Sequence, residues 1–171
     1  QVKGRVMRFT AFLVDDDPGV LKALSRLIRT AGYESRGYLS PRDFLRDHDP
    51  SVPGCAILDL TMPDPSERIA QALAAQQCEP EFVVNNAGFG LVGLAADLDR
   101  GQQVAMVDLN VRVLTDLSLA FLDSLKRRRG GLLNVASVAA FLPGPGMAVY
   151  YATKAYVLSF SEALHRELEP E

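Results

Sequence analysis

The sequence predicts an α/β protein in which five parallel strands form one sheet between two layers of helices. Short apolar runs alternate with segments of helical period along the whole chain, which is typical of parallel strands joined by covering helices. The 171 residues are 48% hydrophobic and 23% charged, the size and composition of one globular domain. Capping residues mark the starts of the first three expected helices. We therefore expect a single doubly wound domain over residues 1–171.

Three strands are expected in the first half, over residues 9–14, 33–38 and 55–60. Asp17 and Pro18 are suited to the N-cap and first turn of the helix after the first strand. Gly32 is suited to the left-handed position that ends it. Ser40 and Asp43 form a capping-box-like start for a second helix. The third strand is nearly all apolar, so we expect it at the centre of the sheet.

The second half continues the same alternation of strands and helices. The expected helices cover residues 64–77, 99–110, 112–129 and 150–168, and the expected strands cover 81–86 and 132–136. The short helix 64–77 suits a crossover between neighbouring strands. This predicts the strand order 2-1-3-4-5. The alternative order is 3-2-1-4-5, in which the third strand lies outside the second.

Net charge and cysteine content limit which partners and which cellular compartment we expect. A net charge of −3 gives no strong attraction to nucleic acid or to anionic membranes. No apolar run approaches the roughly 20 residues of a membrane span, and no signal peptide precedes the first strand. Cys55 and Cys78 have neither metal nor redox spacing, so we expect two reduced, buried thiols in a cytoplasmic protein.

Acidic residues follow the first strand and end the third. Asp15 and Asp16 come after the first strand, and Asp59 precedes Thr61 and a Met-Pro pair. Residues 9–64 thereby resemble the receiver domain of two-component response regulators, which has the flavodoxin-like order 2-1-3-4-5. The resemblance implies Asp59 as phosphoacceptor and Asp15, Asp16 and Asp59 as ligands of Mg²⁺, with the Thr61 carbonyl as a further ligand. Oxygen ligands of this kind suit Mg²⁺.

The receiver pattern is incomplete in the second half. A receiver has Thr or Ser at the end of strand four and Lys-Pro at the end of strand five. Here strand four ends in Asn85-Asn86-Ala87-Gly88 and strand five runs toward Ser137. We therefore expect weak Mg²⁺ binding without a signalling response.

A second set of motifs lies after residue 66. It comprises Asn85-Asn86-Ala87-Gly88, Asn110, Ser137, Tyr150 and Lys154. Tyr150 and Lys154 are spaced i and i+4, so they share one helical face. A neighbouring ammonium favours the phenolate form of tyrosine. Tyr150 is therefore a candidate general acid/base.

Residues 66–169 resemble the short-chain dehydrogenase/reductase family on these motifs, within a half that covers residues 65–171. The resemblance implies a Rossmann-like fold and NAD(P)-dependent chemistry. The strand order of this family is 3-2-1-4-5, the alternative to the predicted order 2-1-3-4-5. Ser137 would hold the substrate carbonyl, and Asn110 would support a proton relay. Lys154 would bind the nicotinamide ribose, and Asn86, Ala87 and Gly88 would line the cofactor cleft.

This second pattern is incomplete in the first half. The family binds its pyrophosphate on a Gly-rich turn at a helix N-terminus, whereas here the first strand leads into Asp15-Asp16-Asp17. Residues 88–93 fit G-x-G-x-x-G but coincide with the NNAG stretch, so they add no independent dinucleotide motif. Three carboxylates would repel a pyrophosphate. We therefore expect no tightly bound cofactor and no saturable NAD(P) binding below millimolar.

These observations predict a recombined or engineered fold chimera, a receiver half joined to a dehydrogenase half, without a complete native active site. Its catalytic residues would then be vestigial. One alternative is an NAD(P)-dependent short-chain oxidoreductase, and another is a receiver-like phosphoacceptor that binds Mg²⁺. We also expect a homodimer through the two long helices 112–129 and 150–168.

Overall fold

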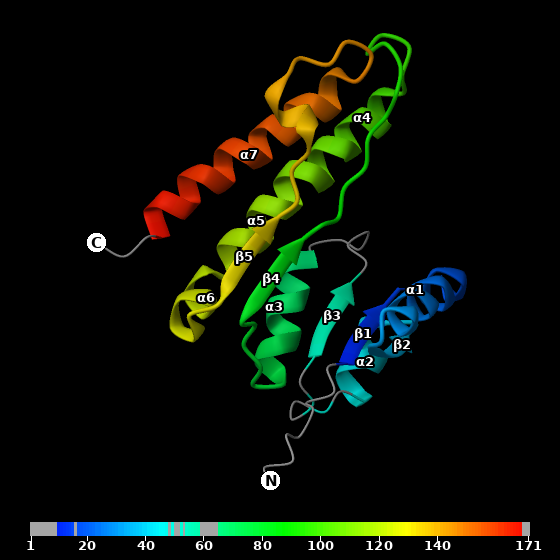
Figure 1. Cartoon of the computed structure of the whole chain (residues 1–171), viewed down its shortest axis with the longest axis vertical. Helices are drawn as coiled ribbons and strands as arrows, with labels where there is room; N and C mark the ends of the chain where they lie inside the picture. Colours follow the sequence, from blue (N-terminus) through cyan, green and yellow to red (C-terminus); the bar gives the residue numbers. More distant parts are fainter. Residues whose placement is uncertain are drawn as a thin grey trace. The chain divides into compact units, whose positions relative to one another are not determined.

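The computed structural model describes residues 10–15, 17–47, 49, 52, 54–58 and 65–168 (Figure 1). The chain divides into two compact units. The first comprises residues 1–63 and 72–78, and the second comprises residues 64–71 and 79–171. Helix α3 (Pro65–Ala75) begins in the second unit and ends in the first.

The first unit contains a parallel three-stranded sheet in the order β2-β1-β3. Its elements are β1 (Thr10–Val14), α1 (Pro18–Thr30), β2 (Glu34–Tyr38), α2 (Pro41–Asp47) and β3 (Gly54–Leu58). In the register of the pairs, Phe12 lies opposite Arg36 on one side and Ala56 on the other. Strand β1 is therefore the central strand of this sheet.

The helix ends of the first unit follow the expected capping chemistry. The Asp17 carboxylate accepts hydrogen bonds from the backbone N–H groups of Gly19 at 2.7 Å and Val20 at 3.4 Å. Gly32 has φ +87°, the left-handed conformation that glycine adopts without steric cost. The Ser40 hydroxyl donates to Asp43 and accepts from its backbone N–H. These local predictions are confirmed.

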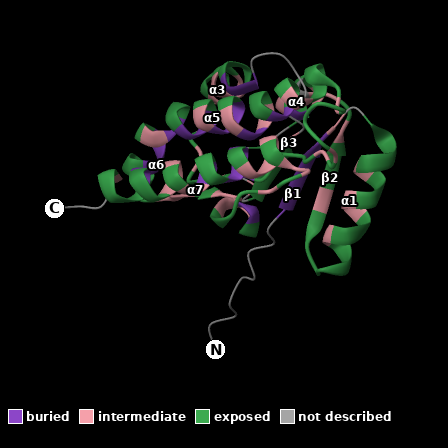
Figure 2. Cartoon of the chain, turned by 90° about the horizontal axis from the view of Figure 1, so that it is seen from above, coloured by how far each residue is buried: buried purple, intermediate pink, exposed green. Residues whose placement is uncertain are grey.

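The core of the first unit forms around β1 and α2. Phe12, Val14 and Phe44 are buried together, and Tyr38 and Leu58 pack against them. The rings of Phe12 and Phe44 lie 5.7 Å apart in a tilted arrangement, a favourable aromatic geometry. Figure 2 shows the buried residues on β1 and the exposed outer face of α1.

Within the three-stranded sheet of the first unit β3 lies at the edge, and a central position for β3 in a five-stranded sheet stays a prediction. Strand β3 pairs with β1 alone among the described strands, and Gly54–Ile57 are exposed. An apolar run records composition and not strand position. The prediction of buried thiols is wrong at Cys55, which is exposed and free, while Cys78 is half-buried and free.

The second unit pairs β4 (Phe82–Asn85) with β5 (Gly131–Asn134) in parallel. Its helical elements are α4 (Arg100–Val107), η1 (Asp108–Val113), α5 (Leu114–Ala120), α6 (Leu122–Arg128), η2 (Val138–Phe141) and α7 (Ala148–Leu168). Helix α7 contacts α4, η1 and η2, and the long helices run alongside one another in Figure 1. Met106, Val113, Leu117 and Val157 are buried side chains of these helices.

The helices between β4 and β5 differ from the expected pair. The sequence predicted a break near Arg112, but α4, η1 and α5 follow without interruption. Element η1 is a π-helical turn, a wider turn that is frequent at functional sites. The interruption falls instead at Phe121, between α5 and α6.

The chain therefore has an α/β, Rossmann-like architecture with parallel strands and covering helices. Strand β2 does not lie between β1 and β3, which excludes the alternative order 3-2-1-4-5 for this sheet. Placement of β4 and β5 beyond β3, and the single five-stranded sheet, remain predictions. No helix among the described residues combines the length and apolarity that a bilayer span requires.

Candidate active site

Lys154 is the buried cation of the second unit. It lies on α7 with 6% of its surface exposed, and its Nζ donates to the Val135 carbonyl at 2.8 Å. An ammonium has three N–H donors, and this is its one hydrogen bond to the described residues. Two donors therefore remain available for a ligand. The same Nζ lies 6.0 Å from the centroid of the Tyr150 ring, one helical turn away.

Asn110 connects the π-helical turn to two other elements. It is 1% exposed. Its Oδ1 accepts from the Phe89 N–H at 3.1 Å, and its Nδ2 donates to the Phe89 carbonyl at 2.9 Å. The second Nδ2 hydrogen reaches the Thr153 hydroxyl at 3.1 Å, which in turn donates to the Tyr150 carbonyl at 2.7 Å. The Asn110 side chain thus positions both the loop after β4 and the start of α7.

The loop after β4 lies against this cluster, and glycines make that approach possible. A Cβ at Gly88 would lie 2.8 Å from Asn110 Oδ1 and 3.7 Å from Lys154 Nζ. A Cβ at Gly90 would lie 2.9 Å from the Tyr150 ring. Asn86 is exposed and Ala87 is half-buried beside them. The structure therefore brings the expected cofactor loop, Asn110, Tyr150 and Lys154 together.

Ser137 lies at the start of η2, two residues after the carbonyl that holds Lys154. Its Oγ accepts from the Ala139 N–H at 3.2 Å, which fixes the side chain as the N-cap of η2. A serine hydroxyl also carries one proton to donate. Ser137 can therefore hydrogen-bond a carbonyl oxygen while it keeps this cap.

The cavity behind Tyr150 is too small for a substrate. It is lined by residues that include Leu91, Met106, Met147 and Tyr150, and its volume is about 10 Å³. That is about the volume that holds one water molecule. A substrate would therefore have to approach Tyr150 from its solvent side.

A buried polar network joins the two strands to the helices, and sequence reasoning found only part of it. Asn85 Nδ2 donates to Asn134 Oδ1 at 2.8 Å and to Ser118 Oγ at 3.0 Å. Asn134 Nδ2 donates to Ser161 at 3.0 Å. Asn134 ends β5, so its side chain serves hydrogen bonding at the strand end. The NNAG motif pointed to Asn85, but no short-range pattern marks Ser118 or Ser161.

The predicted metal site falls largely outside the described residues. Asp16, Asp59 and Thr61 lie outside them. Asp15 is described, and its Oδ1 accepts from the Asp17 N–H at 2.8 Å. Within the described residues, no group of three His, Cys, Asp or Glu side chains could hold a metal ion.

A scan of family models matches residues 54–171 to the short chain dehydrogenase model. The chain is 29% identical to the 3-oxoacyl-[acyl-carrier-protein] reductase FabG of Vibrio cholerae, over 84% of this chain and 57% of that protein. A short-chain dehydrogenase from Sphingobium yanoikuyae, solved with NADPH, has 27% identity and a TM-score of 0.65. The alignment covers 93% of this chain and 56% of that one. The chain belongs to the short-chain dehydrogenase family.

The family match changes the interpretation of the first half. The match begins at residue 54, so the dehydrogenase family also accounts for β3, which had been assigned to a receiver half over residues 9–64. The comparisons give no support to a receiver half. The chimera therefore remains an unsupported prediction, and the oxidoreductase alternative is the better supported one. The chain spans between 19% and 57% of the length of curated relatives such as FabG.

The expectation that NAD(P) does not bind is wrong for proteins of this kind. Similar structures were solved with NADPH, with NADP in a metagenomic oxidoreductase at 25% identity, and with NAD in a Burkholderia phymatum protein at 25% identity. The expectation rested on the repulsion of three carboxylates. The Asp15 and Asp17 carboxylates accept backbone N–H groups at the start of α1, where the helix dipole offsets negative charge.

Proposed function

We propose that this chain provides the catalytic residues of an NAD(P)-dependent oxidoreductase that interconverts a carbonyl compound and its alcohol. One observation carries the proposal. The buried Lys154 ammonium lies one helical turn from Tyr150, with two donors unused by the described residues, and Asn110 fastens the loop after β4 beside them. These residues fit the nicotinamide end of the cofactor.

Each residue of the site has a separate role in the proposed reaction. Bound nicotinamide supplies or accepts a hydride. Tyr150 transfers its phenolic proton to the substrate oxygen and takes one back in the reverse direction. Ser137 donates its hydroxyl proton to the same oxygen, which stabilises the developing negative charge. Lys154 would hold ribose hydroxyls with the donors that its hydrogen bond to Val135 leaves unused.

An apolar substituent on the substrate is supported by the residues that follow Ser137. Val138, Phe141 and Leu142 are large apolar side chains that are 85%, 70% and 67% exposed. Apolar walls with few polar groups are typical of small-molecule sites. The similarity to FabG, whose name specifies a 3-oxoacyl substrate, makes a short 3-oxoacyl thioester the first compound to test.

Cofactor binding and turnover test this proposal directly. We expect NADPH or NADH fluorescence to show saturable binding with a Kd below about 1 mM, and NADPH absorbance to fall when the 3-oxoacyl thioester is added. Lys154→Met keeps the length of the side chain but removes the ammonium, so it should weaken cofactor binding about tenfold or more. Absence of saturable binding to both cofactors would reject the proposal.

We also propose a homodimer through helices α5 and α7. Thr115 and Tyr156 hydrogen-bond at 2.9 Å on an exposed surface, and the Tyr156 ring stacks on Phe160. Leu119, one turn from Thr115, is 53% exposed. Aromatic and aliphatic side chains gathered on one helical face are typical of interface cores.

Light scattering tests the dimer. At high micromolar concentration we expect about 37 kDa, twice the 18.6 kDa of one chain. Leu119→Glu would bury an unpaired carboxylate in the interface and should give a monomer, whereas Leu27→Glu, at an exposed position of α1 in the first unit, should leave the dimer intact. A monomeric unmodified chain would refute the proposal.

A further inference from the structure

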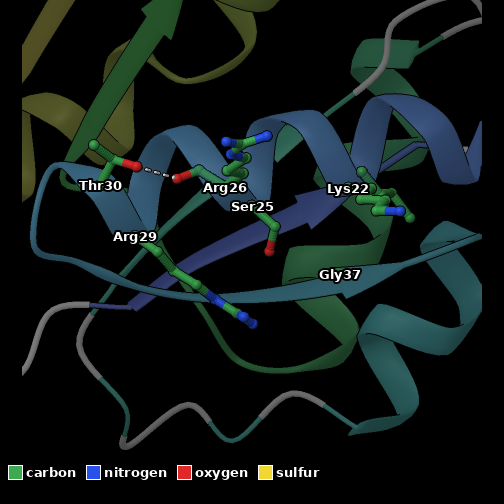
Figure 3. A pocket seen from close by; sticks show the side chains of 7 residues that line it. Lys22, Ser25, Arg26, Arg29, Thr30 and Gly37 are labelled. Atoms are coloured by element: carbon green, nitrogen blue, oxygen red, sulfur yellow. Dashed lines mark hydrogen bonds between the residues drawn. The ribbon is translucent and has the colours of Figure 1, made fainter.

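A groove lined by cations lies between α1 and β2 in the first unit (Figure 3). It is open, with a volume of about 630 Å³, and its lining includes Lys22, Arg26 and Arg29 of α1 and Gly37 of β2. In Figure 3 the side chain of Arg29 extends from α1 across strand β2. This groove takes no part in the chemistry proposed above.

The charge of the groove is unbalanced. Lys22, Arg26 and Arg29 are exposed, and none of them forms a salt bridge with a described residue. Helix α1 contains no acidic residue. Three like charges on one helical face repel one another, so an anionic partner would relieve this repulsion.

Strand β2 borders the groove with an open edge. It pairs with β1 and with no other described strand. The Tyr38 carbonyl accepts from the Asp15 N–H, so the hydrogen-bonding groups of Tyr38 face β1. Backbone groups of successive residues in a strand face opposite edges. Those of Ser35 and Gly37 therefore face outward, away from β1.

We propose that an extended acidic segment of a partner protein adds to the free edge of β2 as a further strand, with acidic side chains against α1. Backbone hydrogen bonds give affinity in this mode of recognition, and alternate side chains give specificity. Side chains on one face of a strand recur every ~6.7 Å. Lys22 and Arg26 are ~6 Å apart along α1, and Arg26 and Arg29 are ~4.5 Å apart. Acidic residues at alternate positions therefore recur at nearly the spacing of Lys22 and Arg26.

Charge also decides against a second copy of this chain as the occupant. Two copies that paired through their β2 edges would bring the cations of two α1 helices together. Juxtaposed like charges oppose association. The partner is therefore a segment with acidic residues at alternate positions, and docking it requires both the cations and the outward N–H groups.

Peptide binding to the unmodified 171-residue chain is the first test. We expect fluorescence anisotropy to show saturable, salt-sensitive binding of a labelled (Glu-Thr)4 peptide. A (Lys-Thr)4 peptide should not bind, because its charges match those of the groove. A (Glu-Thr)4 peptide N-methylated at every residue keeps its charge but loses its backbone donors, so it should bind about tenfold more weakly.

Variants of the chain separately test the backbone hydrogen bonds of β2 and the cations of α1. Gly37→Pro removes an outward N–H, and Pro is tolerated on a free edge, so binding should fall about tenfold. Gly37→Ala keeps that N–H, and its Cβ would meet Leu21 at an ordinary 3.7 Å, so binding should be unchanged. Arg26→Glu should weaken binding about tenfold, while Arg42→Glu on α2, outside the groove lining, should not.

Three results would overturn the proposal. They are no binding of (Glu-Thr)4, equal binding of the N-methylated peptide, and equal binding by Gly37→Pro and Gly37→Ala with both variants folded by circular dichroism. The second and third results would identify the groove as a site for simple anions. Self-association abolished by Gly37→Pro would point to a second copy as the occupant.

Discussion

Tyr150→Phe is expected to lower kcat for carbonyl reduction by about 10²- to 10⁴-fold, the range that a positioned general acid contributes. The variant keeps the ring, whose edge packs against Gly90, and removes only the hydroxyl. Cofactor affinity should change little, because Lys154 is held independently by the Val135 carbonyl. Steady-state NADPH oxidation gives kcat, and a fluorescence titration gives the Kd for NADPH.

Tyr151→Phe is the matched control for this variant. Tyr151 follows Tyr150 on α7, with the two rings 6.2 Å apart, but its ring packs against Gly144, in the loop between η2 and α7. Loss of its hydroxyl should leave kcat within about twofold, since no proton transfer is assigned to it. Equal losses in the two variants, or an unchanged kcat in Tyr150→Phe, would remove Tyr150 from the mechanism.

Local chemistry made much of the fold predictable. Asp17, Gly32 and the Ser40–Asp43 pair act within four residues of the chain, so their roles follow from short-range hydrogen bonding and backbone conformation. The position of β3 depends instead on pairing with β1, more than forty residues earlier. Its apolar composition fits a central and an edge strand equally well, so composition alone does not give its position.

The candidate site was predictable where its residues share one helix. Tyr150 and Lys154 lie one turn apart in any α-helix. The partners of Asn110 were not predictable, because they come from the loop after β4 and from α7. The π-helical turn that carries Asn110 has no capping signal, so the sequence suggested a break between two helices instead.

The error over the cofactor came from counting charges without their partners. Asp15 and Asp17 were treated as carboxylates aimed at a pyrophosphate. In the structure both accept backbone N–H groups around the first turn of α1. A charge that already accepts hydrogen bonds at a helix N-terminus is partly compensated, so a Coulomb estimate for bare carboxylates exaggerates the repulsion.

Asn110→Leu is expected to cost about 3 kcal/mol of unfolding free energy. Leucine has a similar volume but accepts and donates no hydrogen bonds. Asn110 would lose its hydrogen bonds to the N–H and carbonyl of Phe89 and to the Thr153 hydroxyl, and each such bond contributes about 0.5–1.5 kcal/mol. The midpoint of urea unfolding measures the change.

A control substitution on the exposed face of the same turn shows whether the loss of stability comes from the Asn110 hydrogen bonds or from any substitution in the π-helical turn. Arg112 pairs with Asp108 there, and an exposed pair of this kind contributes about 0–1 kcal/mol, so Arg112→Ala should change stability little. Asn110→Leu should also lower kcat at urea concentrations well below the unfolding midpoint, where the variant is still folded. The reason is that Gly88 and the start of α7 lose their common anchor. A loss of stability below about 1 kcal/mol, with kcat retained, would show that the loop after β4 holds its position without Asn110.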